Sequence, residues 1–428
     1  MAASLTDAKS AELYARAVQR LPGGVNSPVR AMRAIGRDPL FIERAEGAEI
    51  VDVDGNRFVD YVCSWGPLIH GHAHPEILAA VTEAASRGTT FGAPTLGEVE
   101  IAEEVARRIP SIDMLRMTSS GTEAAMSAIR VARAVTGREK LLKFAGAYHG
   151  HLDGLLAEAG SGLATAGVPA SAGVSASATA NTVIVPWNDG EAVVAACREH
   201  EFAAILAEPY PANMGLVPPY EDFLQLLRNQ ADATGALLVF DEVISGFRVG
   251  PGGAQEREGV TPDMTVLGKI VGGGLPAAAY GASREIMEQV APAGPVYQAG
   301  TLSGNPLAVA AGLTTLRLLD EAAYLRLAAT TETLVGGLQE AAGDIPVQIV
   351  SVPGLLTVFF SETPIHDYAT AQACDLNAHA AWIRGLLARG VYAPPSQFEA
   401  WFPSLAHTQD HVDRTLDAAA AAFAELGA

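Results

Sequence analysis

The sequence predicts an α/β protein with two domains: a large domain around a mainly parallel sheet, and a smaller α+β domain formed by both ends of the chain. Three observations predict it. Between about residues 114 and 283, short apolar runs of strand length alternate with helix-length segments, as in βαβ units. The flanking regions instead mix short strands with helices. With 428 residues, of which 49% are hydrophobic and 18% charged, the chain can bury more than one core.

The N-terminal segment, residues 1–65, contains a helical pattern followed by a hairpin. Strands are expected over Ala48–Val53 and Asn56–Tyr61, with the turn at Asp54-Gly55. The segment is assigned to the smaller domain.

The central part, residues 66–319, is expected to form the large domain. Most of its strand-like runs are separated by helix-length segments, which implies right-handed crossovers and a mainly parallel sheet. The expected strands are Leu115–Thr118, Lys140–Phe144, Thr182–Pro186, Ala203–Ala207, Ala236–Phe240, Met264–Leu267 and Ala277–Gly281.

The C-terminal part, residues 320–428, is expected to complete the smaller domain. It begins with a helix, continues with a strand over Leu355–Phe360 and a helix over Ala378–Leu387, and then has a further strand. An alanine-rich helix after Thr408 ends the pattern.

One lysine of the central part is a candidate for covalent chemistry. The chain has four lysines against 24 arginines (28 of both kinds together, less four), so arginine supplies most positive charge. Lys269 nevertheless lies in an apolar, glycine-rich run, where burial lowers the pKa of an amine and lets it attack an aldehyde. The alternative is a lysine at the end of a buried strand whose ammonium group reaches solvent.

A carboxylate 28 residues earlier suggests the cofactor. Asp241 follows the apolar run Gly235–Phe240, which has the composition of a buried parallel strand, and ligands bind at such strand ends. Asp241 taken alone could equally cap a helix. An aspartate that protonates a pyridine nitrogen, paired with a lysine that holds an aldehyde as a Schiff base, is typical of pyridoxal phosphate sites.

A phosphate site is predicted at the turn that contains Ser120, Gly121 and Thr122. The turn lies between a predicted strand and the helical pattern Glu123–Val135, which Gly137 closes. The free N–H groups and the dipole of a helix N-terminus favour an anion. Ordinary N-capping is the alternative.

Composition excludes several classes of partner. The net charge of −20 argues against nucleic acid and anionic membranes. The three cysteines are odd in number and far apart, which fits a reducing cytoplasm, and no apolar run or leader pattern indicates a membrane or export. The histidines at 70, 72, 74, 149 and 151 lack the spacing of a metal site, so no metal is predicted and loop hydrogen bonds are expected instead.

One long segment interrupts the alternation of strands and helices. Residues 160–174 are rich in Gly, Ala, Ser and Pro and carry no charge. They are interpreted as a gating loop that includes Gly160, Ser161 and Gly162, with a disordered linker as the alternative.

These motifs together resemble the glutamate-1-semialdehyde 2,1-aminomutases, members of the class-III pyridoxal-phosphate-dependent aminotransferase family. The resemblance runs from about residue 5 to 425. Lys269, Asp241 and the Ser-Gly-Thr turn are shared with other fold-type I aminotransferases and therefore indicate only the cofactor. The segments that carry the resemblance are Leu21–Ala31, Ser64–Pro67, Gly71–Pro75, Thr90–Pro94, Ser120–Ala124, Tyr148–His151, Phe240–Val243, Leu267–Pro276, Tyr297–Pro306 and Pro395–Ala400.

The resemblance implies a role for each matching residue. Lys269 would bind the cofactor and transfer protons, Asp241 would pair with the pyridine nitrogen, and Tyr148 would stack on the ring. The phosphate would be bound by Gly121 and Thr122, with Thr301 of the other subunit, which implies a homodimer with shared active sites. Ser27 and Arg30 would hold the substrate carboxylate, and Trp65 and Glu399 would line the pocket. Asn213 would meet the phenolic oxygen, although Pro211 departs from the family pattern and could shift this loop.

The implied reaction converts glutamate 1-semialdehyde, (S)-4-amino-5-oxopentanoate, to 5-aminolevulinate through 4,5-diaminovalerate, in tetrapyrrole synthesis. The resting cofactor would be pyridoxamine phosphate, and the upstream glutamyl-tRNA reductase is a possible docking partner. The nearest alternative is an intermolecular ω-aminotransferase of the same fold. A racemase and a catalytically silent cofactor-binding regulator are more distant alternatives.

Overall fold

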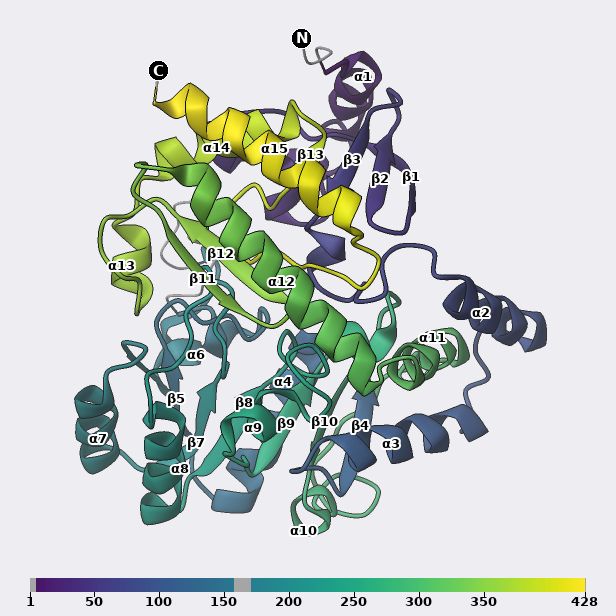
Figure 1. Cartoon of the computed structure of the whole chain (residues 1–428). Coiled ribbons are helices and arrows are strands. Elements are labelled where there is room, and N and C mark those ends of the chain that lie inside the picture. Colours follow the sequence, from purple (N-terminus) through teal and green to yellow (C-terminus); the bar gives the residue numbers. More distant parts are fainter. Residues whose placement is uncertain (1–4, 158–170, 428) are drawn as a thin grey trace.

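The fold is built on a seven-stranded sheet, shown in Figure 1 as arrows through the lower half of the molecule. The computed structural model describes residues 5–157 and 171–427. The strand order is β4-β10-β9-β8-β7-β5-β6, and only β10 runs antiparallel to its neighbours. The strands are β4 (Met114–Thr118), β5 (Lys140–Phe144), β6 (Thr182–Val185), β7 (Phe202–Ala207), β8 (Leu237–Asp241), β9 (Met264–Leu267) and β10 (Ala278–Ala282). The mainly parallel sheet is confirmed.

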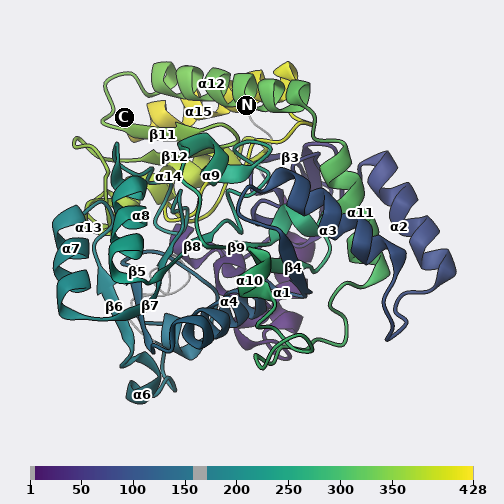
Figure 2. The same ribbon diagram turned by 90° about the horizontal axis from the view of Figure 1, so that it is seen from below.

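Helices cover both faces of this sheet because its strands are apolar on both sides. Val239 of β8 packs towards α4 (Gly121–Thr136), whereas Leu238 and Phe240 pack on the other face with α8 (Phe223–Thr234). Helix α7 (Gly190–Glu199) packs beside α8 along β6, and Figure 2 shows the two together at one edge. Helix α4 ends at Gly137, whose φ of 68° makes it the expected C-cap.

A second sheet joins the two ends of the chain. Its order is β1-β2-β3-β13, in which β13 (Val391–Tyr392) pairs in parallel with β3 (Arg57–Asp60). Strands β2 (Glu49–Asp52) and β3 form the predicted hairpin, whereas β1 (Ile42–Glu46) was not predicted. Helices α1 (Ala8–Ala17) and α15 (Gln409–Leu426), near the two ends of the chain, lie beside this sheet at the top of Figure 1.

The C-terminal helices pack over a two-stranded sheet and share one core with the N-terminal segment. These elements are α12 (Glu321–Ala342), β11 (Gln348–Val352), β12 (Leu355–Phe359), α13 (Tyr368–Gln372), α14 (Leu376–Leu387) and α15 (Gln409–Leu426). The predicted strand at 355–360 and the helices at 378–387 and after 408 are confirmed, whereas β11 was not predicted. The proposed domain boundaries at residues 65 and 319 remain a prediction.

The remaining helices lie around the large sheet and at the N-terminus. Helices α2 (Pro75–Arg87) and α3 (Leu96–Arg108) both pack against α11 (Pro306–Arg317), to the right in Figure 1. The others are α1 (Ala8–Ala17), α6 (Ala176–Thr179), α9 (Gly253–Glu258) and α10 (Arg284–Met287), with 3-10 turns η1 (Pro22–Gly24), η2 (Pro28–Ala31), η3 (Arg33–Ile35), η4 (Cys63–Trp65), η5 (Asp153–Leu155) and η6 (Lys269–Gly272). Within the described ranges, no helix has both the length and the apolar character needed to cross a membrane.

Candidate active site

The site forms where parallel strands end. Asp241 is the last residue of β8 and is in register with Val266 of the neighbouring strand β9, which is followed by Lys269. A pocket of about 520 Å³ opens beside them. It is lined by Asn26, Ser27, Pro28, Val29, Trp65, Tyr148, His151, Leu156, Ser171, Asn213, Lys269 and Glu399. Segments more than 350 residues apart in the sequence therefore meet around one amine.

Lys269 presents a partly buried amine to this pocket. Its backbone is in the left-handed region, with φ of 48°, directly after Gly268, where a Cβ would lie only 3.1 Å from Val243 Cγ1. Burial lowers the pKa of Lys269, while the carboxylates of Glu399, Glu208 and Asp241 act in the opposite direction. No hydrogen bond or ion pair of its ε-amino group is found among the described residues. The amine is thus placed to react.

Asp241 is fixed by two hydrogen bonds. Its Oδ1 accepts from the Val243 N–H at 3.1 Å, and its Oδ2 lies 2.8 Å from Nδ1 of His149. Both side chains are buried, and burial lowers the pKa of His149 despite the nearby carboxylate. A neutral His149 with its proton on Nδ1 donates to Asp241, which leaves Asp241 an oriented acceptor. His149 Nε2 has no partner among the described residues.

The predicted phosphate turn lies beside the pocket. Ser120 caps α4 by accepting from the Glu123 N–H at 3.3 Å, so the hydroxyl also serves the helix. Thr122 Oγ1 lies 3.1 Å from Nδ1 of His151, which lines the pocket. Gly150 has φ of 83°, and a Cβ there would lie 2.5 Å from Thr122 Oγ1. Only glycine therefore lets the 148–151 turn approach the N-terminus of α4 so closely.

The opposite wall carries the residues predicted to meet substrate. Ser27, Trp65 and Glu399 all line the pocket. Trp65 lies in a strained turn in which Cys63, Ser64 and Trp65 all have positive φ values. Asp60 stabilises this turn by accepting from the Val62 and Cys63 N–H groups.

Two predicted residues lie outside the pocket lining, and one predicted segment is not described. Arg30 is exposed on η2, next to residues that line the pocket but not itself among them. Thr301 lines a separate surface hollow with residues 90–95, so one chain does not bring it to Lys269. Residues Gly160, Ser161 and Gly162 lie outside the described ranges.

Two buried groups of the site were not predicted. His149 was considered only as a metal ligand or a loop residue, and its contact with Asp241 was missed. Glu208 is 4% exposed and accepts from the Tyr148 N–H at 2.8 Å and from Asn213 Nδ2 at 3.0 Å. Glu208 follows β7 directly, so the strand-end argument that found Asp241 applies to it equally.

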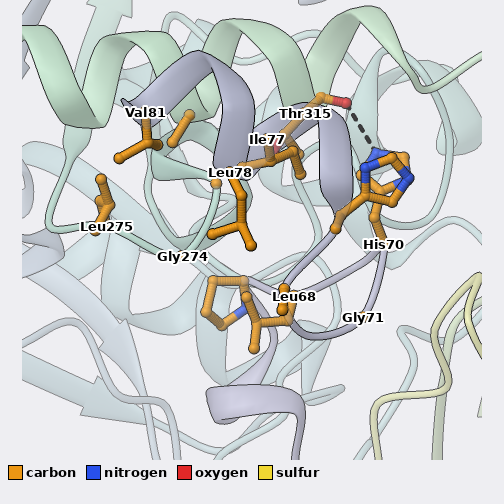
Figure 3. A pocket seen from close by; sticks show the side chains of 14 residues that line it. Leu68, His70, Gly71, Ile77, Leu78, Val81, Gly274, Leu275 and Thr315 are labelled. Atoms are coloured by element: carbon orange, nitrogen blue, oxygen red, sulfur yellow. Dashed lines mark hydrogen bonds between the residues drawn. The ribbon is translucent and has the colours of Figure 1, made fainter. Parts of the chain in front are cut away.

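A second, smaller cavity is unsuited to charged ligands. It has about 180 Å³ and lies between α2, residues 273–275 and α11. Figure 3 shows apolar side chains, among them Leu68, Ile77 and Leu78, around it, with His70 Nε2 held 3.0 Å from the Thr315 carbonyl oxygen. Burial lowers the pKa of His70, so this wall carries no fixed charge. A cofactor with a phosphate fits the Lys269 pocket better.

The residues around Lys269 fit pyridoxal phosphate. The amine has no partner among the described side chains, Asp241 is oriented by a neutral histidine, and the close approach at Gly150 leaves the N-terminus of α4 beside the pocket. These are the groups that an aldehyde, a pyridine nitrogen and a phosphate require.

Comparison with known proteins agrees with this arrangement. The family model for class-III aminotransferases matches residues 32–423. A Thermomicrobium roseum protein named glutamate-1-semialdehyde 2,1-aminomutase is 52% identical over 422 residues, 97% of this chain and 98% of its own length. A Brevibacillus brevis protein named glutamate-1-semialdehyde 2,1-aminomutase 2 is 54% identical over 415 residues, 96% of this chain and 97% of its own length.

Solved structures show the same fold. An omega-transaminase from Sphaerobacter thermophilus superposes with a TM-score of 0.90 at 34% identity, covering 98% of both chains. A glutamate-1-semialdehyde-aminomutase from Pseudomonas aeruginosa, solved in complex with PMP, gives a TM-score of 0.88 at 28% identity over 98% of this chain and 94% of its own. Matched over nearly its whole length, the chain belongs to the class-III aminotransferase family, in the group of proteins named glutamate-1-semialdehyde 2,1-aminomutase.

Proposed function

We propose that this chain is a pyridoxal-phosphate-dependent isomerase that converts glutamate 1-semialdehyde to 5-aminolevulinate through 4,5-diaminovalerate, for tetrapyrrole synthesis. Identity of 52–54% to relatives that carry the aminomutase name supports this reaction over others of the family. The observation that carries the chemistry is the position of the Lys269 amine beside the Asp241–His149 pair, in a pocket also lined by Ser27, Trp65 and Glu399.

The cofactor end of the pocket would be held by groups of this chain. When bound, pyridoxal phosphate supplies an electron-withdrawing ring that stabilises negative charge on the carbon next to the substrate nitrogen. Asp241 Oδ1 or Oδ2 would hold a proton on the ring nitrogen, and Tyr148 would cover one ring face. The N–H groups at the start of α4, with Thr122 Oγ1, would bind the phosphate.

Lys269 is the group that moves protons. Its Nζ would transfer protons between the cofactor and a substrate carbon, first at one and then at the other of the two carbons that exchange the amino group, because burial lowers the pKa of the amine. Ser27 and Arg30 would hold the substrate carboxylate and so fix which carbons face Nζ. Trp65 and Glu399 would close the opposite wall and exclude water.

The active protein is proposed to be a homodimer with shared sites. Large apolar side chains are exposed near Thr301: Phe91 is 52%, Leu96 74%, Tyr297 72% and Leu302 52% exposed. Such exposed apolar surface is typical of an interface, and a second copy seated there would bring its Thr301 to the phosphate. Cytoplasmic location and docking of the upstream reductase also remain proposals that follow from the resemblance.

One assay tests the reaction against its nearest alternative. Purified protein is incubated with glutamate 1-semialdehyde and no added keto acid or amine donor, and 5-aminolevulinate is measured. An aminomutase turns over repeatedly because it retains the nitrogen, whereas an intermolecular aminotransferase stops after one turnover per site. Resumed turnover on addition of a keto acid or donor would favour the aminotransferase and reject the proposal.

A further inference from the structure

Glu208 occupies the position next to Asp241 on the neighbouring strand. Ala207 of β7 is in register with Phe240 of β8, so the following residues, Glu208 and Asp241, leave adjacent parallel strands at the same level. Side chains alternate along strands, and both carboxyl groups therefore project to the face that α4 covers. Burial and the negative charge of Asp241 raise the pKa of Glu208, whereas the charge of Lys269 acts in the opposite direction.

The two oxygens of Glu208 join opposite parts of the site. Oε1 accepts from the Tyr148 N–H at 2.8 Å. Oε2 accepts from Asn213 Nδ2 at 3.0 Å and from the Ala212 N–H at 3.4 Å. Tyr148 and Asn213 both line the Lys269 pocket, whereas Glu208 does not. Glu208 thus contacts two pocket residues from behind.

We propose that Glu208 is a positioning residue that fixes the Asn213 amide and the Tyr148 backbone against the cofactor. This rests on the proposed attachment of the cofactor to Lys269. After the proline-rich turn Pro209-Tyr210-Pro211, the Ala212 N–H and Asn213 Nδ2 both donate to the Glu208 side chain, which links the end of β7 to the pocket wall.

The hydrogen bonds of Glu208 do not depend on its negative charge. Burial, and then the nearby Asp241, raise the pKa of Glu208 to about 8, so below that pH the group is neutral and still accepts its hydrogen bonds. The groups whose charges act on Lys269 are Glu399, Asp241 and Arg248, joined by Glu208 when it ionises above about pH 8. Replacing Glu208 by a neutral residue therefore removes mainly hydrogen-bond acceptors below pH 8.

The test uses the pH dependence of the absorbance of the cofactor bound to Lys269. An amide N–H that reaches the phenolic oxygen disperses its negative charge and so lowers the pKa of the nitrogen attached to Lys269. Glu208→Met removes both acceptors at nearly constant side-chain length and should raise the titration midpoint by about 0.5–1 pH unit, the size expected for one lost hydrogen bond. Glu208→Gln, which keeps one acceptor oxygen, should give a smaller upward shift.

Two further variants test whether the effect of Glu208 on the titration midpoint depends on Asn213. If Glu208 acts through Asn213, adding Glu208→Met to Asn213→Ala should shift the midpoint by no more than about 0.2 pH unit. Glu242→Met is the matched control: Glu242 is fully buried and accepts from the Ala254 N–H, the Gln255 N–H and Gln255 Nε2, away from the pocket. It should lose stability without moving the midpoint.

The outcomes separate this inference from the proposed function. An unchanged midpoint, a downward shift, or an equal shift with and without Asn213 would overturn the role of Glu208. A wild-type protein that, after loading with pyridoxal phosphate, shows no absorbance of a cofactor bound to Lys269 would instead overturn the proposed function. Thermal unfolding of the cofactor-free variants shows whether each is folded.

Discussion

At the scale of single residues, the chemistry depends on groups that differ from their nearest substitutes in one property. A lysine and an arginine in water carry the same charge at pH 7, but only the lysine amine can lose a proton and bond to an aldehyde carbon. Burial lowers the pKa of this amine, and Gly268 before it lets Val243 approach the backbone, since a Cβ there would lie 3.1 Å from Val243 Cγ1.

Lys269→Arg should therefore abolish covalent attachment of the cofactor and all turnover, while the fold survives. The measurement is absorbance after addition of pyridoxal phosphate, with and without borohydride reduction, followed by mass determination. A fixed cofactor in the variant would show that another amine reacts. Lys143 offers no substitute in the described structure, because its amine donates to the carbonyl oxygens of Leu155 and Ala157.

Arg30 tests the substrate side. If it binds the substrate carboxylate with both guanidinium nitrogens, Arg30→Lys keeps the charge but loses that geometry. The value of kcat/KM should then fall. The fall should correspond to a loss of about 1.5–3 kcal/mol of transition-state stabilisation, the range for a charge-assisted hydrogen bond. Cofactor absorbance should not change. Full activity of the variant would mean that the substrate carboxylate binds elsewhere. The test is informative because Arg30 is exposed in the single chain.

The sequence predicted the candidate cofactor-binding residues better than the buried residues that hydrogen-bond to them or to their neighbours. Lys269 and Asp241 stood out because their chemistry is particular and they follow apolar runs. Glu208 and His149 did not, because their function depends on which backbone and side-chain atoms meet them. Such contacts between strand ends depend on register, and a single sequence does not specify register.

At the scale of elements, all strands of the large sheet were predictable, whereas β1 and β11 of the smaller sheets were not. The strands of the large sheet are apolar on both faces, so each gives a continuous run that differs by at most two residues from the observed bounds. Strand β1 is mostly exposed and carries charged residues, so it gives no clear pattern, whereas the two-residue β13 lies where a further strand was predicted after the helix at 378–387. The antiparallel direction of β10 follows from the short η6 connection, which is too short for a crossover helix.

The strained turn that carries Trp65 depends on one buried arginine. Arg248 is fully buried and donates to the carbonyl oxygens of Gly66, Gly354 at 3.1 Å and Pro403 at 3.2 Å, with its guanidinium carbon 5.2 Å from the Phe402 ring centroid. It thus joins η4, the β11–β12 turn and the segment before α15.

Arg248→Met should lower the free energy of unfolding by about 3 kcal/mol, because three buried carbonyl groups lose their donor. Urea denaturation measures this. Arg414→Met is the control, since Arg414 is 43% exposed and its ion pair with Glu49 should contribute less than about 1 kcal/mol. A similar small loss in both variants would mean that water replaces the Arg248 contacts.

Helix α14 carries an acid-sensitive group. His379 packs edge-on against Phe360, and burial lowers its pKa to about 3. The unfolded chain then binds a proton below about pH 6.5 that the folded chain does not, so stability falls as the pH drops towards 3. At pH 5 this single group should reduce the free energy of unfolding by about 2 kcal/mol.

His379→Leu should remove that part of the loss between pH 7 and pH 5, as measured by urea denaturation at both values. His366→Leu, at a side chain that is 41% exposed, serves as the comparison and should leave the acid sensitivity as in the wild type. If His379→Leu loses as much stability on acidification as the wild type, other groups cause the acid sensitivity.

At the scale of the whole molecule, the single chain brings most of the predicted site residues together but leaves Thr301 apart from them. Lys269, Asp241 and the α4 N-terminus come together, whereas Thr301 lies in a hollow beside exposed apolar residues. This separation could not be read from the sequence by spacing. Only the resemblance assigned Thr301 to the partner subunit, and the exposed surface around it gives that assignment a physical reason.

Mixing two inactive variants tests the shared site directly. In the proposed dimer, Thr301 of each subunit reaches the phosphate bound in the site of the other subunit. The Lys269→Ala substitution therefore removes the amine from the site of the subunit that carries it, whereas Thr301→Ala weakens the phosphate contact in the partner's site. A hybrid dimer then has one site that lacks both groups and one that is complete. With random pairing, half of the dimers are hybrid, so about a quarter of all sites become complete.

The two proteins are unfolded together in urea and refolded, at a cofactor concentration too low to saturate Thr301→Ala. Turnover should rise to about a quarter of the wild-type value, well above the mean of the two variants refolded separately. If the mixture shows only that mean, Thr301 acts within its own chain or not at all, and the exposed apolar surface around Phe91 and Leu302 needs another occupant.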